Sequence, residues 1–159
     1  MRLLVGFAVS SAILLTGIPN SFAQRLAGKS VFMTGLQIVK HCDGSRCKNQ
    51  QPYKFTLKRY IGKSGKIIFD YGRGSVSGDL FKVGVKHKSG AVYQLKGNVM
   101  SFTVPSDNST YILTTRVTGK TCSSSAKIKH HPNGKTRNRK STVRLQSLRC
   151  KVSVGNAFK

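Results

Sequence analysis

The sequence contains no glutamate and no tryptophan, and its four acidic residues are all aspartates. The absence of Glu removes a carboxylic acid that enzymes commonly tune as a general acid or base. A glycosidase pair would require two aspartates to converge. Asp43, Asp70, Asp79 and Asp107 lie in or beside expected turns, where Asp usually bonds the local backbone. We therefore assign no catalytic residue and expect a non-enzymatic protein.

Four histidines leave one enzymatic alternative open, namely a secreted nuclease or similar hydrolase. In such an enzyme, His would act as acid and base while Lys stabilised the phosphorane. No spacing singles out a pair among His41, His87, His130 and His131. Two histidines converging in a cleft with a Lys would support this alternative. The adjacent His130 and His131 point to opposite faces of a strand, so they cannot ligate one ion, and we expect neither metal nor cofactor.

Basic residues dominate the charge, with 28 Lys and Arg against 4 acids and a formal net charge of +24. No acid follows Asp107, whereas Lys and Arg continue to the end of the chain. Such a surface attracts polyanions at low salt, and lipopolysaccharide, acidic polysaccharide, nucleic acid and anionic membrane surfaces are candidate partners. An equal alternative is that the charge serves solubility alone.

The first residues have the pattern of a secretory signal peptide. Arg2 precedes the apolar run 3–18, Pro19 and Asn20 break the run, and Ser21-Phe22-Ala23 presents small residues for cleavage. We predict a signal peptide over 1–23 and a mature single domain over 24–159. The run is short for a membrane span, and no later stretch is apolar enough for one. The predicted location is therefore periplasmic or extracellular.

Four cysteines in an exported chain predict two disulfides. Of the three connectivities we favour Cys42–Cys47, which brackets a tight turn containing Gly44, together with Cys122–Cys150. A four-cysteine zinc site is the competing interpretation. The chain has no C-x-x-C spacing, which disfavours it.

Alternating hydrophobicity predicts an all-β domain of about eight to nine antiparallel strands in a meander, either a sandwich or an up-and-down barrel. In Tyr53 to Ile61, for example, Tyr53, Phe55 and Leu57 alternate with polar residues. Gly35 interrupts the first strand and predicts a bulge or a close backbone approach. The expected strands cover 31–40, 53–61, 66–71, 80–87, 91–96, 99–104 and 110–118, followed by the segment 121–152, and 41–52 is expected to be a polar loop.

The segment 121–152 is predicted to form a hairpin with a loop near Thr136, tied at its base by Cys122 and Cys150. The apolar positions change face near Gln146-Ser147, which predicts a bulge that bends the hairpin.

The connection between these strands is the predicted contact surface for polyanions. It is rich in cations and has no acid or aromatic residue, which favours non-specific polyanion contact over base recognition. A small-ligand carrier with a barrel cavity is a further alternative. The predicted polyanion-binding residues are Lys127, Lys129, Lys135, Arg137, Arg139, Lys140 and Arg144.

Overall fold

The computed structural model describes residues 26–71 and 79–158. The predicted signal peptide lies outside the described residues, as does the whole of the segment 72–78. The described chain forms antiparallel β-strands, as the sequence predicts. They are β1 (Lys29–Asp43), β2 (Arg46–Asn49), β3 (Tyr53–Ile61), β4 (Lys66–Tyr71), β5 (Asp79–Lys82), β6 (Val92–Lys96), β7 (Val99–Pro105), β8 (Ser109–Thr118), β9 (Thr121–His130) and β10 (Arg139–Val154).

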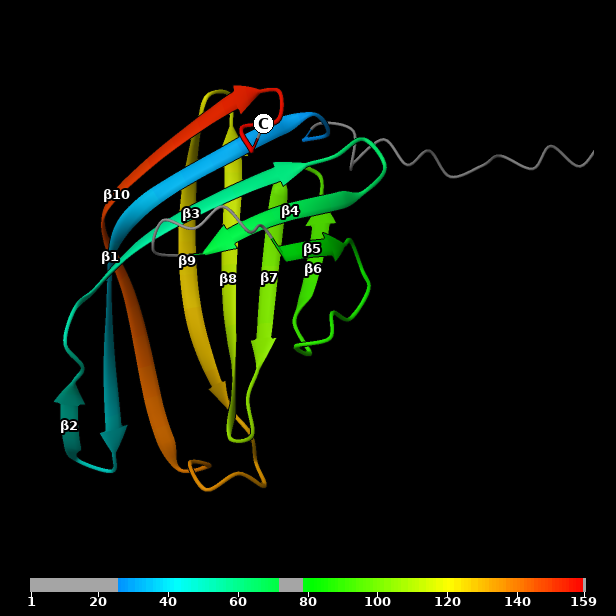
Figure 1. Cartoon of the computed structure of the whole chain (residues 1–159). Helices are drawn as coiled ribbons and strands as arrows, with labels where there is room; N and C mark the ends of the chain where they lie inside the picture. Colours follow the sequence, from blue (N-terminus) through cyan, green and yellow to red (C-terminus); the bar gives the residue numbers. More distant parts are fainter. Residues whose placement is uncertain (1–25, 72–78, 159) are drawn as a thin grey trace, which may run out of the picture.

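The strands form two sheets that face each other. A six-stranded sheet has the order β10-β1-β3-β4-β5, with β2 paired to β1, and a four-stranded sheet has the order β6-β7-β8-β9. Figure 1 shows the upper parts of β10, β1, β3 and β4 crossing in front of β6 to β9. This arrangement has features of both predicted alternatives, the sandwich and the up-and-down barrel. The molecule has two sheets, but its strands follow one another around the core in chain order, and β10 returns to β1.

β1 and β10 share a bend that changes their direction halfway along (Figure 1). Their register shifts between Thr34 and Leu36, and Ser147 on β10 adopts a positive φ of 50°. This confirms the predicted bulge. A Cβ on Gly35 would lie 3.0 Å from the Phe55 ring and 3.1 Å from the Gln146 carbonyl oxygen. A side chain here would require the ring or the carbonyl to shift by a few tenths of an ångström, so the structure confirms the expected close backbone approach at Gly35.

The two sheets meet along β9 and β10 without a continuous ladder. Among the described strands, β9 pairs with β8 and β10 pairs with β1. The predicted β9–β10 hairpin is therefore wrong in its pairing, because β1 offers β10 an edge along its whole length. The predicted disulfides are confirmed. Cys122–Cys150 spans the seam between the sheets with a Cα–Cα distance of 5.5 Å, and the Val152 amide donates to the Lys120 carbonyl nearby.

Two apolar clusters fill the space between the sheets. The larger one stacks Tyr93 on Phe102, with ring centroids 4.6 Å apart, and sets Phe81 edge-on to both rings. The smaller one gathers residues such as Val31 and Val152 at the upper end. Cys122 packs against both clusters, so the disulfide lies beside the apolar core.

A buried polar layer crosses the core as well. Arg59 is 1% exposed and donates to the Thr115 hydroxyl at 3.1 Å, and Ser124 donates to the same hydroxyl. Burial raises the pKa of Tyr93 to about 12, although the neighbouring Arg59 opposes this shift. The alternation of β3 thus places a cation among apolar side chains, a position that sequence patterning alone would assign to a hydrophobic residue.

Two expected segments differ from the structure. The predicted polar loop 41–52 contains the end of β1 and the whole of β2, because Cys42 and Cys47 pair across a turn in which Gly44 has a φ of 61°. The predicted strand 80–87 ends at Lys82. Gly84 has a φ of 76°, which turns the chain out of the extended conformation and leaves Val85 48% exposed.

Loss of the Cys122–Cys150 disulfide is expected to destabilise the fold more than loss of Cys42–Cys47. The sequence separations are 28 and 5, so the chain-entropy relation predicts about 3.5 kcal/mol for the first and about 2 kcal/mol for the second. Urea unfolding of the C122S/C150S and C42S/C47S double variants measures both values. Equal losses, or the reverse order, would contradict a dominant role for the seam disulfide.

Candidate functional site

The predicted polyanion-binding residues do not form one cluster. Lys127 and Lys129 are exposed on the outside of the four-stranded sheet, whereas Lys140 and Arg144 point outward from the six-stranded sheet. Lys135 and Arg137 are exposed in the connection between β9 and β10. Arg139 turns inward and binds Asp43. The seven residues therefore lie in four different surroundings, because alternate residues of a strand face opposite sides.

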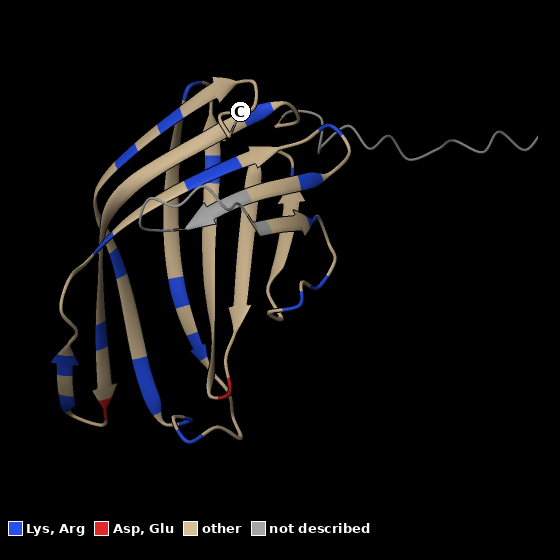
Figure 2. Cartoon of the chain, in the orientation of Figure 1, with Lys and Arg blue, Asp and Glu red and all other residues tan. Residues whose placement is uncertain are grey.

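A larger set of cations lies on the outside of the six-stranded sheet. The register places Lys151 and Lys58 on either side of Phe32, and Arg144 beside Ile38. We call the outward cations of this sheet the basic face, and Figure 2 shows its Lys and Arg spread over β10, β1, β3 and β4. The members of the basic face are Lys40, Lys54, Lys58, Lys66, Lys82, Lys140, Arg144, Arg149 and Lys151.

Carboxylates offset little of this charge. Asp43 is held by Arg139 at the lower end of the sheet, with both guanidinium–carboxylate contacts at 3.0 Å. Asp70 is in register with Lys58, and its side chain lies outside the described set. Among the described side chains of the basic face, all the ionisable groups are cationic apart from the phenol of Tyr60, so the face has a strongly positive potential.

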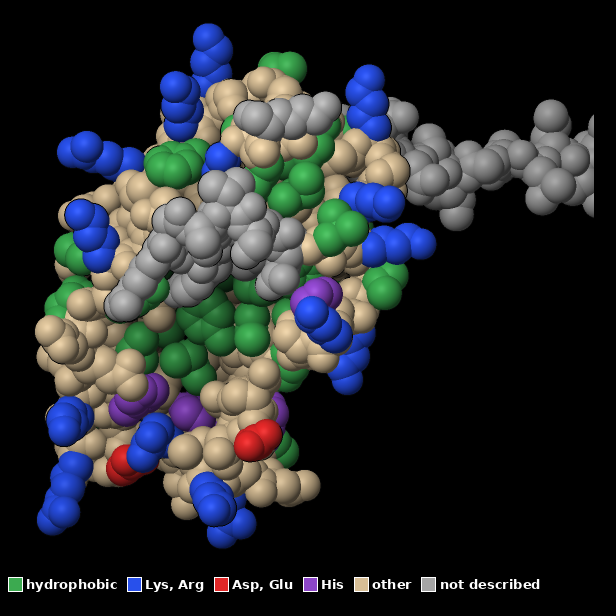
Figure 3. Space-filling model, in the orientation of Figure 1, with side chains coloured by type: hydrophobic (Ala, Val, Ile, Leu, Met, Phe, Trp, Pro, Cys, Tyr) green, Lys and Arg blue, Asp and Glu red, His purple; other side chains and the backbone are tan. Residues whose placement is uncertain are grey.

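Two hollows lie along β1 on the basic face. The first, of about 660 Å³, is lined by Leu36 and by the cations Lys54 and Arg149, where the bulge opens the surface. The second, of about 370 Å³, is lined by Ile38 and by the cations Lys40 and Arg144. Each hollow thus combines one apolar side chain of β1 with two cations from neighbouring positions. Figure 3 shows hydrophobic side chains exposed between Lys and Arg on the side of the molecule in view.

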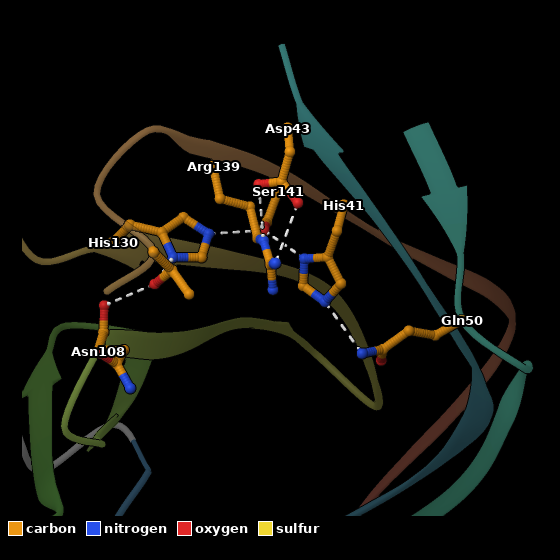
Figure 4. A network of polar contacts seen from close by, with 8 residues as sticks. His41, Asp43, Gln50, Asn108, His130, Arg139 and Ser141 are labelled. Carbon is orange, nitrogen blue, oxygen red and sulfur yellow. Dashed lines mark hydrogen bonds and ion pairs between the residues drawn. The ribbon is translucent and has the colours of Figure 1, made fainter. Parts of the chain in front are cut away.

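A second polar constellation lies at the lower end of the seam, where β1, β9 and β10 meet (Figure 4). The Ser141 hydroxyl lies 2.6 Å from Nδ1 of His41 and 2.7 Å from Nε2 of His130. Nδ1 of His130 lies 2.8 Å from the Thr136 hydroxyl, and Nε2 of His41 lies 3.0 Å from the Gln50 amide nitrogen. We call this set the histidine chain. It joins the two sheets by side chains where the backbone ladder does not.

The histidine chain has one self-consistent direction. Thr136 donates its single hydroxyl proton to the Asn108 carbonyl, so it accepts from His130 Nδ1–H. His130 Nε2 then accepts from Ser141, and Ser141 accepts from His41 Nδ1–H. The remaining His41 nitrogen accepts from Gln50. His130 is neutral in this arrangement, and a proton on its Nε2 would break its bond with the Ser141 hydroxyl proton.

The surroundings favour the neutral form of His130. Desolvation is the largest cause of its lowered pKa, and the nearby His41, Arg139 and His131 add to the shift, while Asp43 opposes it. The hydrogen bond from Arg139 lowers the pKa of the Asp43 carboxyl and raises that of the Arg139 guanidinium. These two groups therefore keep opposite charges beside a neutral His130.

The other predicted histidines lie elsewhere. His131 diverges from His130 and contacts the Thr110 hydroxyl, while His87 contacts Ser89 and packs against the Phe81 ring. In the described part of the chain, no group of three His, Cys, Asp or Glu side chains is arranged to hold a metal.

A cleft of about 490 Å³ beside β2 is lined by His41, Lys48 and Arg139, among others. Sequence reasoning missed Ser141, Thr136 and Gln50, because only the pairing of β1 with β10 brings position 141 beside position 41.

Comparisons with protein-family models, with curated proteins and with solved structures find no match to this chain. Within residues 26–71 and 79–158, the structure has no helix of the length and apolarity needed to cross a membrane.

Acidification is expected to lower stability through His130. Because its folded pKa lies below its unfolded value, the unfolded chain binds more protons just below about pH 6.5, so the free energy of unfolding falls as the pH drops from there. Thermal unfolding from about pH 7 to about pH 5 measures this slope. The H130Q variant should show a shallower slope than the wild type, whereas H87Q, remote from the seam, should retain it. An unchanged slope in H130Q would contradict the assignment.

Proposed function

We propose that this chain is a non-enzymatic, exported protein that binds polyanions through the basic face of its six-stranded sheet. Its two disulfides are compatible with an oxidising periplasmic or extracellular compartment. Binding is electrostatic at long range and therefore weakens as salt screens the cations.

The observation that carries this proposal is the unequal distribution of charge between the two sheets. The outside of the four-stranded sheet presents mostly Ser, Thr and apolar residues, with four cations among them, Lys96, Arg116, Lys127 and Lys129, against the nine of the basic face. On the basic face, every paired strand from β10 to β5 contributes at least one outward cation. A partner with many negative groups gains most by lying along the second surface.

The histidine chain does not serve as the basis of the proposal. His41 and His130 do converge, with ring centroids 6.5 Å apart, and His41 shares a cleft with Lys48. However, all four ring nitrogens of the pair already make hydrogen bonds inside the protein. A phosphodiester would have to displace these bonds before either imidazole could accept or donate a proton, which favours a structural role.

A small-ligand carrier also receives less support. The space between the upper halves of the sheets holds two apolar clusters and the stacked rings of Tyr93 and Phe102. The hollows with combined cationic and apolar lining lie on the outside of the sheet.

Removal of three cations from the basic face is expected to weaken heparin binding. The K40Q/K140Q/R144Q variant should bind on the order of tenfold to a hundredfold more weakly at low salt, and its dependence of log K on log salt should be flatter by roughly two to three units. Isothermal titration calorimetry at several salt concentrations measures both quantities. The substituted side chains are exposed, so the melting temperature should stay close to that of the wild type.

The matched control removes the same charge from the opposite surface. In R116Q/K127Q/K129Q the cations are lost from the outside of β8 and β9. Affinity should fall clearly less in this variant than in K40Q/K140Q/R144Q. Equal losses would show that net charge, rather than the basic face, governs binding, and salt-independent binding by the wild type would reject an electrostatic mechanism.

A further inference from the structure

The outward side chains of β1 are unusual for a surface that contacts a soluble polymer. Phe32, Leu36 and Ile38 lie on the outside of the strand, with Thr34 between the first two. Phe32 is 43% exposed, and Leu36 and Ile38 are half-buried. Across the upper part of the same face, Tyr60, Ile68 and Leu80 form a row in register, and Leu80 is 55% exposed. Isolated apolar side chains are common on protein surfaces, but several of them together on the most charged face of the molecule indicate a partner that contacts both kinds of side chain.

The cations flank this apolar strip on both sides. Phe32 lies between Lys58 of β3 and Lys151 of β10, and directly paired side chains have Cβ atoms about 5 Å apart. Leu36 is in register with Lys54, and Ile38 with Arg144. The pattern is an apolar centre bordered by positive charge, which is the pattern of surfaces that lie on anionic membranes.

The two hollows on the basic face each combine cationic and apolar side chains. In the hollow at the bulge, Lys54 and Arg149 accompany Leu36, and in its neighbour Lys40 and Arg144 accompany Ile38. A phosphate group can bind the two cations of a hollow while the apolar side chain contacts the glycerol and upper acyl region of the same lipid. A hydrated polysaccharide or nucleic-acid backbone would use the cations but would leave the apolar strip exposed to water.

We infer that the partner of the basic face is a phospholipid surface with anionic head groups, with the two hollows as head-group sites and Phe32, Leu36 and Ile38 as interfacial contacts. This inference rests on the proposed polyanion binding. Affinity for such a surface combines the attraction of each Lys and Arg with the burial of apolar area.

The test compares two surfaces that carry negative charge but differ in apolar content. Vesicles of phosphatidylcholine mixed with phosphatidylglycerol present charge and acyl chains, heparin presents charge alone, and phosphatidylcholine vesicles present little net charge. Wild-type protein should bind the mixed vesicles and heparin at low salt, and phosphatidylcholine vesicles much more weakly. In about 1 M salt, where the Debye length is about 3 Å, binding to the mixed vesicles should persist in part while heparin binding is lost.

The decisive variant is F32T/I38T, because Thr keeps the strand propensity and removes apolar area. Its affinity for the mixed vesicles should fall about tenfold, and its affinity for heparin should stay within about twofold of the wild type. If the double variant unfolds, the single variant I38T replaces it in the test. Its affinity for the mixed vesicles should fall by a smaller factor.

The matched control is I112T on the outside of β8, where Ile112 is half-buried and in register with the cation Lys127. It makes the same substitution beside a cation on the opposite surface, and its vesicle affinity should be unchanged. If I112T and I38T weaken vesicle binding equally, or if neither weakens it, the lipid inference is overturned. Retained heparin binding would then leave the proposed function standing with a soluble polymer as partner. Failure of the wild type to bind either charged surface would reject both.

Discussion

The structure depends on a seam between two sheets that lack a backbone ladder where they meet. β9 and β10 lie side by side, yet each gives its ladder hydrogen bonds to another strand, β8 or β1. Side chains therefore hold the seam. The Cys122–Cys150 disulfide closes it at the core end, and the histidine chain bridges it at the lower end. The first link is covalent and independent of protonation, whereas the second depends on the neutral form of His130. The ladder with β1 aligns β10 within its own sheet, and the two links of the seam hold β10 beside β9 of the other sheet.

The bend at Gly35 and Ser147 connects the seam to the candidate binding surface. The register shift bends β1, so that its two halves contact different parts of the molecule. The upper half then covers the apolar clusters, while the lower half carries His41 to the seam. The extra residue of β10 at the bulge also opens the outer surface, where Leu36, Lys54 and Arg149 line a hollow. One local irregularity thus serves packing, the seam and the basic face together.

Local features were predictable from the sequence, and long-range pairing was not. The alternation in Tyr53–Ile61 predicts β3 to the residue, and the change of face at Gln146-Ser147 predicts the bulge. The tight turn predicts Cys42–Cys47, and Cys122–Cys150 was predicted correctly from a hairpin whose ladder the structure lacks. The expected hairpin failed because β9 and β10 are neighbours in sequence and in space without sharing a ladder. The sequence around β9 and β10 does not distinguish this arrangement from a hairpin. The ladder partner of β10 is set by the free edge of β1, which lies more than a hundred residues away in sequence. The histidine chain could not be predicted for the same reason, because Ser141 lies beside His41 only through the pairing of β10 with β1.

The predicted polyanion-binding residues, from Lys127 to Arg144, show that cations close together in sequence can be far apart on the surface of a β-protein. A loop or one helix face would keep Lys127 to Arg144 together, but the two-residue period of strands sends alternate side chains to opposite surfaces. Arg139 faces inward to Asp43, and its neighbour Lys140 faces outward. The reverse holds for the basic face, whose members come from five separate stretches of sequence and meet only across the ladders. Mutual repulsion among these cations acts against the sheet that presents them. The short-range bonds of the sheet and the covalent seam must therefore oppose this repulsion, and a bound anionic partner would relieve it, so that partner binding and stability of the six-stranded sheet are thermodynamically linked.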